Sequence, residues 1–423
     1  MELSRTRPIN RGGTELTPQN QDSSKEGWRT RNVWGFSLAS LFSDMGHELV
    51  TAVLPAFLLT IGAPVIALGV IEGVSNLSQS LAALWGGNHA RWTSKRKWLV
   101  VAGYVLTGFK ALIALVFYWP WIVLIRTAAW VGRGERGPIR DTVIAEEVTD
   151  RNRGKAYGFR ETFDTLGAIA GPLAAAVLIS VVPARTLIAL SAIPAVLTIA
   201  VIVVFFRDRT RPQALPGPSV NEPRAVWPRA FRQFRRAAVI FSIGAVPPTF
   251  FILRVLQTHI HILSLKTAAL GFGLYTVHNI FYAGSSFPAG ILSDRGQMKG
   301  TALSGYLLWA AALAGFAVLP QVGPWVWLVL FVLSGFSTGL IETGQKAMTA
   351  QIAPDRLRGK ALGQIAGLRG LSQFAGTLLL GGLWTLGYPD WGFVVMAAAA
   401  LTGSFLMMGV PSPVSAANES GHS

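Results

Sequence analysis

Long apolar stretches alternate with short polar segments from residue 33 onward. Stretches such as 97–118 (KWLVVAGYVLTGFKALIALVFY) and 186–206 (TLIALSAIPAVLTIAVIVVFF) have about the 20 residues that an α-helix needs to cross a bilayer. The pattern predicts twelve spans in two sets of six, at 33–60, 65–88, 97–118, 120–138, 156–182 and 186–206, then 237–257, 268–292, 300–319, 323–346, 360–383 and 390–410. We therefore expect an all-α membrane protein with twelve transmembrane helices.

The polar segments divide the chain into parts. We expect a cytoplasmic N-terminal arm (1–32), a six-helix bundle (33–206), a cytoplasmic basic, proline-rich linker (207–236), a second six-helix bundle (237–410) and a cytoplasmic tail (411–423). The linker cannot enter lipid because arginine and proline dominate it. The arm lacks the apolar run that a cleavable signal peptide requires.

Composition and charge placement agree with a membrane protein. Of the 423 residues, 51% are hydrophobic and 14% charged, whereas a soluble domain has about 25% charged residues. The net charge of +16 first suggests a nucleic-acid partner. However, thirty of the 37 Lys and Arg residues fall on the predicted side that holds both termini and the linker, against two on the other side. Positive loops remain cytoplasmic, so we expect cytoplasmic termini, a plasma-membrane location and no nucleic acid.

The two sets of spans are related in sequence. Residues 145–172 and 350–376 share the pattern DRxRGKAxG at a constant offset of 205, which makes Arg153 and Arg358 equivalent. The chain is thus expected to use one six-helix unit twice, in the same orientation. Parallel repeats of this kind occur in transporters, whose binding sites lie between the halves near the bilayer midplane.

Three short motifs carry a family resemblance. Residues 290–295 read GILSDR, with Gly290, Asp294 and Arg295, and 86–97 read GGNHARWTSKRK, with Arg91 at the place of the aspartate. In the fourth span Arg126 is followed by Gly132, Arg133 and Gly134. The fifth span has Gly158, Gly167, Gly171, Pro172 and the pair Ala175-Ala176. Over about 33–410 the chain resembles the major facilitator superfamily.

The resemblance implies a secondary transporter that works by alternating access. It implies that the acid of GILSDR helps to hold the outward-open state, and that the arginine and glycines of the fourth span serve proton coupling. The fifth span resembles an antiporter motif, with alanines in place of its last two glycines. Small residues at these spacings let helices approach closely, so the alternative is simply a tightly packed helix pair.

Acids within the spans are the first candidates for a site. A charge in the hydrocarbon is costly and usually faces a cavity or the bundle interior. Asp44, His47 and Glu48 share one face of the first span, and Glu72 and Asn76 share one face of the second. We expect these faces to line a polar cavity; the alternative is a buried network that only fixes packing.

Cations within the spans supply possible partners. Lys110, Arg126 and Arg254 lie in spans three, four and seven. We expect Asp44 or Glu48 to carry a proton with Arg126 as its partner, because protonating an acid frees its cation. Alternatively, Lys110 and Arg254 bind an anionic substrate, although Arg254 could also snorkel to the outer interface.

Further polar residues occupy later positions. His278 and Asn279 in the eighth span are candidates for substrate contact. In the fifth span Arg160 and Asp164 are i, i+4 neighbours, expected to form an ion pair that gates the inner mouth.

Other function classes lack their motifs. The chain has no GxxxxGK[ST] run for a nucleotide, no GxSxG elbow and no paired metal-binding histidines, and it has no cysteine. We therefore expect no enzyme, no cofactor and no metal. We expect a monomeric transporter whose partners are a proton, the lipid bilayer and a small organic molecule, such as a drug or metabolite, that it exports. Proton-coupled uptake of an organic anion is the alternative, and a channel is third.

Overall fold

The computed structural model describes residues 27–92, 96–207, 227–258, 265–318, 324–354 and 357–411, and contains no strand within them. The first half consists of α1 (Arg31–Thr60), α2 (Val65–Trp92), α3 (Arg96–Gly108) with the 3₁₀ helix η2 (Phe109–Leu115), α4 (Trp119–Glu147), α5 (Asp150–Leu178), α6 (Ala184–Leu190) and α7 (Ala192–Phe205). The second half consists of α8 (Arg229–Ile243), α9 (Pro248–Thr258), α10 (Leu265–Leu292), the π-turn η3 (Ser293–Gln297), α11 (Met298–Val318), α12 (Pro324–Ile352), α13 (Arg358–Thr385) and α14 (Pro389–Met408).

Some crossings of the bundle are made of two pieces. The α6 and α7 helices together form one crossing, as do α8 and α9. The α8–α9 break covers Gly244 to Pro247, where consecutive prolines at 247 and 248 remove two backbone donors. Fourteen α-helices therefore give twelve crossings of the described chain, and the predicted twelve-helix architecture is confirmed.

Hydropathy separates these crossings into two groups. Seven described stretches are long and apolar enough to span a membrane: Val65–Gly86, Arg96–Leu115, Ala184–Phe205, Arg229–Gln257, Thr267–Val318, Trp325–Ile352 and Pro389–Met408. The stretch Thr267–Val318 includes both α10 and α11. The remaining crossings are α1, α4, α5 and α13. The first three carry most of the buried charges, and α13 is rich in glycine.

The fourth crossing differs from its prediction. The predicted fourth span ends at residue 138, but α4 continues to Glu147 and α5 begins at Asp150, so most of the segment between the predicted spans, 139–155, is helical. Arg133, Arg136 and Arg140, which are counted above among the basic residues of the side that holds the termini, therefore lie within a helix of the bundle. The predicted basic side loses these three residues, but its excess of positive charge persists.

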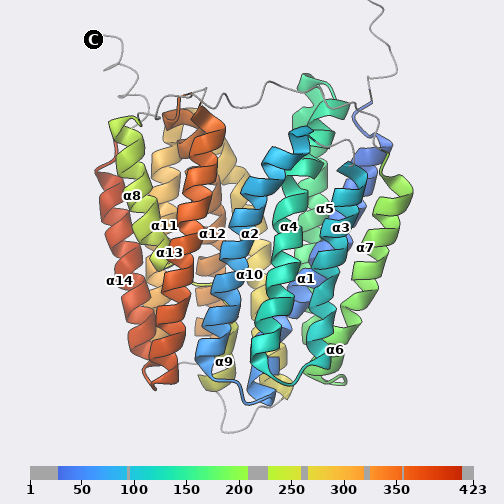
Figure 1. The fold of residues 1–423 in the computed structure, drawn as a ribbon. Coiled ribbons are helices and arrows are strands. Elements are labelled where there is room, and N and C mark those ends of the chain that lie inside the picture. Colours follow the sequence, from blue (N-terminus) through green and yellow to red (C-terminus); the bar gives the residue numbers. More distant parts are fainter. Residues whose placement is uncertain are drawn as a thin grey trace, which may run out of the picture.

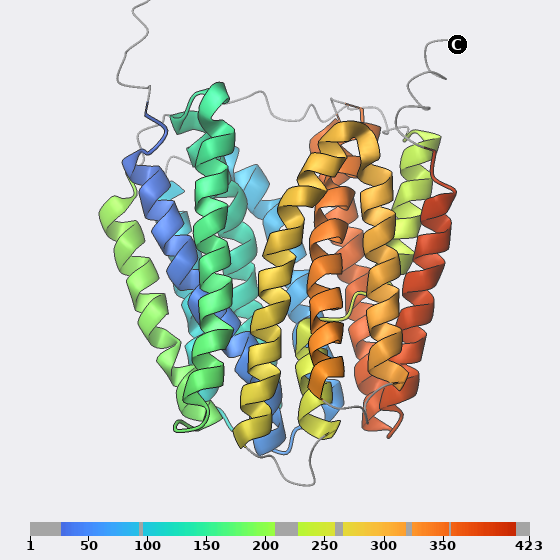
Figure 2. The same cartoon turned by 180° about the vertical axis from the view of Figure 1, so that it is seen from behind.

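The linker joins the halves at one end of the bundle. The α7 helix ends, and α8 begins, at the end of the bundle where α1 begins, which we call the linker end, and the opposite end is the distal end (Figure 1). In Figure 1, α2 and α13 approach each other toward the distal end and diverge toward the linker end. Figure 2 shows the same divergence for α5 and α10 on the other side.

Contacts between α2 and α13 follow this divergence. Toward the distal end their backbones touch, because a Cβ on Gly69 would lie 2.4 Å from the Thr377 carbonyl oxygen. Toward the linker end, Gly363 meets only the tip of the Leu84 side chain. The two halves are therefore packed most closely in their distal part.

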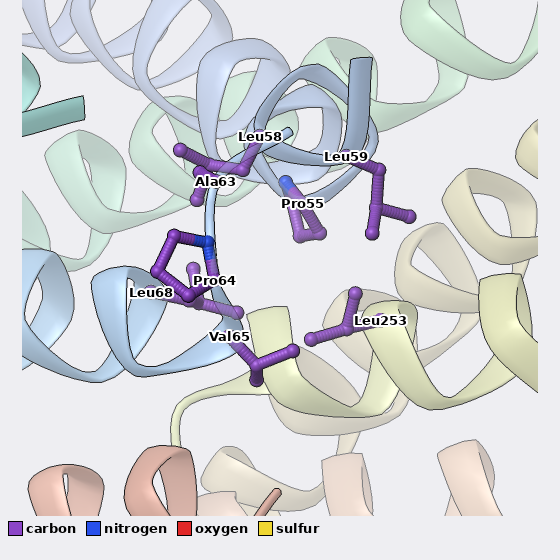
Figure 3. A pocket seen from close by; sticks show the side chains of 8 residues that line it. All are labelled: Pro55, Leu58, Leu59, Ala63, Pro64, Val65, Leu68 and Leu253. Carbon is purple, nitrogen blue, oxygen red and sulfur yellow. The ribbon is translucent and has the colours of Figure 1, made fainter. Parts of the chain in front are cut away.

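Apolar side chains close the distal end. Pro55, Leu58, Leu59, Val65, Leu68 and Leu253, from α1, α2 and α9, surround a small pocket with Ala63 and Pro64 (Figure 3). The pocket has a volume of about 10 Å³, at the limit of what one water requires. Apolar side chains from both halves therefore meet around this pocket.

Two glycines of the fifth span pack α5 directly onto α1. A Cβ on Gly167 would lie 2.3 Å from the Leu41 carbonyl oxygen, and one on Gly171 would lie 2.3 Å from that of Met45. Pro172 follows within the same helix. In contrast, nothing lies within 4 Å of a Cβ on Gly158. Close packing thus depends on the later glycines of the motif.

The internal repeat extends to single hydrogen bonds. Arg153 Nε donates to the carbonyl of Ala145 at 3.0 Å, and Arg358 Nε donates to the carbonyl of Ala350 at 2.9 Å. Each donor and each acceptor is related to its counterpart by the offset of 205. These arginines fasten the turn between the fourth and fifth crossings of each half, at the linker end.

The glycine contacts lead to a stability prediction. Gly171→Ala should lower the unfolding temperature of the purified protein, because overpacking typically costs about 1–3 kcal/mol. Gly158→Ala in the same helix is the matched control, and should leave that temperature unchanged or raise it, since alanine favours helix. Thermal unfolding in detergent measures both. Equal temperatures for the two variants would contradict close α1–α5 packing.

Candidate functional site

The polar face of α1 lies deep in the first half. Glu48 follows Arg31, the first residue of α1, by 17 positions, which places it about 26 Å along the helix. Asp44 and His47 are buried beside it, at 4% and 6% exposure. The two acids differ in their partners, and this difference separates their roles.

Asp44 is held by an arginine of α4. Arg133 donates to both of its carboxylate oxygens, at 2.9 and 3.2 Å. The neighbouring Ser43 binds two further cations, since Arg136 donates to its hydroxyl at 2.9 Å and Lys110 to its carbonyl at 3.2 Å. Lys110 thus lies within the packed first half, at 2% exposure.

Arg126 pairs with an acid of α2. It donates to Glu72 at 2.7 Å, and both side chains are almost fully buried. Its guanidinium also lies over the Trp130 ring, 4.2 Å from the centroid. The predicted pairing of Arg126 with Asp44 or Glu48 is therefore wrong: periodicity identified the faces of α1 and α2, but α4 presents different arginines to each.

The Trp130 ring links the two polar faces. Its indole nitrogen donates to Asn76 at 3.1 Å, and its face lies 4.3 Å from the His47 ring. Glu72, Asn76 and His47 thus belong to one connected network. At their low exposure, Glu72 and His47 fit the alternative of a buried network that fixes packing.

Glu48 is bound differently from these acids. The Tyr275 hydroxyl of α10, in the opposite half, donates to its carboxylate at 2.6 Å. His47 Nε2 lies 3.8 Å away. Among the described residues, no arginine or lysine forms an ion pair with Glu48. This carboxylate therefore joins the two halves through a neutral donor.

Next to this contact, α10 makes a second bond between the halves. Asn279 donates to the backbone carbonyl of Ala168 in α5 at 2.8 Å. His278, one position earlier, is hydrogen-bonded to Ser334 of α12 at 2.8 Å. Of the two predicted contact residues, Asn279 faces the boundary between the halves, whereas His278 lies within the second half.

Arg254 is not part of this group. It is paired with Asp390 of α14 and donates to the Phe316 carbonyl at 3.3 Å. Both α9 and the start of α14 lie at the distal end (Figure 1). The structure therefore does not bring Arg254 and Lys110 together.

A second polar cluster lies nearer the linker end of α5. Arg160 is paired with Glu161 and lies 3.4 Å from Asp164, so the expected ion pair of Arg160 and Asp164 is present. In the second half, Tyr282 donates to Glu342 at 2.9 Å.

The GILSDR segment forms the turn between α10 and α11. Asp294 and Arg295 are exposed within η3, and Gly296 has a φ of 82°, which favours glycine. Gly290 is the earlier glycine of this segment, and nothing lies within 4 Å of a Cβ built on it. The side chain of Arg91, in the equivalent turn of the first half, lies outside the described residues.

Sequence reasoning missed four residues of the site. Arg133, Arg136 and Arg140 contribute to the sequence analysis only through the count of basic residues or a family motif, although their spacing from Arg126 places all four arginines on one face of a helix. That periodicity was a usable signal. Tyr275 had none, because a tyrosine in an apolar span is ordinary.

Comparisons with known proteins agree with this architecture. The family model described as Major Facilitator Superfamily matches residues 36–273 and 248–423. An uncharacterized MFS-type transporter of Methanocaldococcus jannaschii is 27% identical over 405 residues, which are 93% of this chain and 99% of that protein. The class B tetracycline resistance protein of Escherichia coli is 24% identical over 371 residues, covering 83% and 88%.

A solved structure shows the same fold. A mutant of the nucleoside transporter NupG matches with a TM-score of 0.75 at 12% identity, over 90% of this chain and 99% of that one. The repeated six-helix unit, the matching fold and the family model over nearly the whole chain lead to one conclusion: the chain belongs to the major facilitator superfamily.

Proposed function

We propose that the protein is a proton-coupled transporter that exports a small organic molecule, with Glu48 as its proton carrier. The bond between Glu48 and Tyr275 carries this proposal, since it joins the two halves through an ionisable group. The linker end is taken as cytoplasmic, in the plasma membrane, and one chain as the working unit. The diverging linker end and closed distal end then correspond to an inward-facing state.

Partners distinguish Glu48 from the other acids. Asp44 and Glu72 each pair with an arginine, and protonating either would remove the hydrogen-bonded counter-charge of that arginine. Protonating Glu48 removes the ion-pair partner of no arginine or lysine among the described residues. It is therefore the acid of this group whose proton can come and go at the lowest cost.

Ionised Glu48 accepts a charge-assisted bond from Tyr275, and such bonds are stronger than neutral ones. It thereby holds the distal side closed and prevents the empty protein from returning outward. Substrate that disturbs this contact allows the outward transition. A proton then enters from the outside, displaces the substrate and binds to Glu48. The protonated protein returns to the inward-facing state, where it releases the proton.

The direction of transport rests on α5. Its glycines resemble the antiporter motif, and those at 167 and 171 make the close contacts with α1. A relative of the chain is a tetracycline resistance protein. Uptake of an organic anion depended on Lys110 and Arg254 acting together, and their separation favours export.

Neutralising the proton carrier should uncouple transport. Glu48→Gln should abolish accumulation driven by a proton gradient in proteoliposomes, while exchange of substrate across the membrane continues. A thermal-shift panel of tetracycline, uridine, hydrophobic cations and organic acids selects the transported probe, and a pH-sensitive dye follows proton movement.

Asp44→Asn is the comparison for Glu48→Gln. It should lower the unfolding temperature markedly, because removing one partner of a buried ion pair costs about 3–5 kcal/mol. Glu48→Gln should change that temperature little. Gradient-driven accumulation by Glu48→Gln at the wild-type rate would eliminate Glu48 as the proton carrier.

Removing the hydroxyl that links the halves should produce a leak. Tyr275→Phe keeps the acid but loses its bond to the opposite half, so protons should cross without substrate. Tyr282→Phe in the same helix is the matched control, because its hydroxyl bonds Glu342 within one half. Dye-measured proton flux without substrate should rise for Tyr275→Phe alone. Identical leaks in both variants would count against a coupling role for Tyr275.

The absence of native cysteine permits a clean cross-linking test. A Cβ on Gly381 would lie 3.1 Å from the Ile66 Cα, so Ile66→Cys with Gly381→Cys should form a disulfide that keeps the distal end closed. Oxidation should stop transport, and reduction should restore it. Leu84→Cys with Gly363→Cys, at the diverging end, is the control and should cross-link more slowly. Undiminished transport by the oxidised distal pair would refute alternating access.

A further inference from the structure

A basic groove lies at the linker end of α8, apart from the transport site. Arg229, Arg232, Gln233 and Arg236 line it, and their spacing of i, i+3, i+4 and i+7 places them on one helix face. Its volume is about 260 Å³, many times the roughly 10–15 Å³ that one water requires. That is room for a phosphate with a glycerol unit.

The opposite face of α8 fixes how the groove is presented. Ala230, Phe231, Phe234 and Ala237 are buried, so this face packs against the second half and the arginine face points away from it. In both views α8 and α14 form the outer edge of the second half (Figures 1 and 2). The groove therefore opens toward the surroundings of the bundle, away from the first half.

The depth of the groove is that of lipid headgroups. Arg229 is the first residue of α8, and Trp227 just before it stacks on Phe231 with ring centroids 4.4 Å apart. Tryptophan is enriched at the membrane interface. The arginines therefore lie where the phosphates of a bilayer are found.

Charge in the groove is not balanced by the described protein. Arg229, Arg232 and Arg236 are exposed, and none forms a hydrogen bond or ion pair with another described residue. The sequence from 227 to 258 contains no acid. Guanidinium groups match phosphate oxygens with paired donors.

Gln233 adds an acceptor to these donors. Its Oε1 is buried without a hydrogen-bond partner among the described residues, and rotation of the side-chain amide turns this oxygen toward the groove. A phosphate monoester whose oxygens all accept bonds from the arginines has no donor for this oxygen, whereas a hydroxyl of a lipid headgroup donates to it.

We propose that the α8 groove binds the headgroup of an anionic phospholipid that carries hydroxyl groups, with phosphatidylglycerol as the fitting chemistry. The phosphate is held by Arg232 and Arg236, and a glycerol hydroxyl by Gln233. Binding anchors α8, and through it the broken α8–α9 crossing, to the lipid leaflet at the linker end.

The test measures the unfolding temperature of the full purified chain in nonionic detergent with added dioleoyl lipids. Phosphatidylglycerol should raise this temperature, because a ligand of the folded state stabilises it. Phosphatidylcholine should not. Arg232→Gln with Arg236→Gln should weaken the phosphatidylglycerol response roughly five-fold per arginine, the fold change that about 1 kcal/mol per basic residue gives.

A matched control separates this site from general surface charge. Lys155→Gln with Lys360→Gln removes two exposed charges from the same end of the protein, at equivalent positions of the two repeats, and should keep the full response. Equal losses in the two double variants would overturn the groove as a specific site.

Further measurements of the unfolding temperature identify the ligand. Gln233→Leu should reduce the response to phosphatidylglycerol toward that of phosphatidic acid, which has the phosphate but no glycerol hydroxyls. Failure of Gln233→Leu to change this ratio would refute the hydroxyl contact. Stabilisation by soluble glycerol 3-phosphate as large as that by the lipid would refute a lipid ligand. None of these outcomes depends on Glu48 or on transport.

Discussion

The cost of a charge in a lipid environment is the constraint on which this structure depends. A buried ion is tolerated when a partner of opposite charge and further hydrogen bonds compensate it. In the first half, Glu72 supplies the opposite charge for Arg126 and Asp44 supplies it for Arg133, and the Trp130 ring lies over the Arg126 guanidinium. Both arginines lie on α4, so one helix fixes the positions of α1 and α2. The pairs make the first half a rigid unit, and leave Glu48 as the acid of α1 bound to the opposite half.

The second half is held together by different forces. Aromatic rings pack across its interior, with Phe251 stacked on Phe316 at 4.2 Å and Phe393 at 5.7 Å from Phe316. Offset aromatic contacts add about 0.5–1.5 kcal/mol each beyond the burial of their area. Apolar packing of this kind gains nothing from protonation. Tyr275 therefore presents a hydroxyl from a half whose interior is packed by aromatic rings to an acid on a half organised by ion pairs.

The features that could be predicted from the sequence are those that the lipid environment imposes on short stretches of the chain. Span length, the two-fold repeat and the close approach at Gly167 and Gly171 follow from hydropathy and from small residues at fixed spacing. The predicted fourth span ends before α4 does, because polar residues such as Arg140 lower the hydropathy beyond residue 138, although the helical spacing of Arg133, Arg136 and Arg140 indicates one shared face. Ion-pair partners could not be predicted, because spacing shows which residues share a face and not which helix faces them.

The packing of α1 explains why a small change at Glu48 can have a large effect. The helix touches the α5 backbone near Leu41 and Met45, and Asp44 between them is held by two bonds from α4. Close-packed interiors resist gradual deformation, so α1 cannot shift alone when its bond to Tyr275 weakens. The displacement must instead be taken up where the halves meet, through contacts such as that of Asn279 with the Ala168 carbonyl. Under the proposed mechanism, protonation of the Glu48 carboxylate is thereby converted into motion of one half against the other.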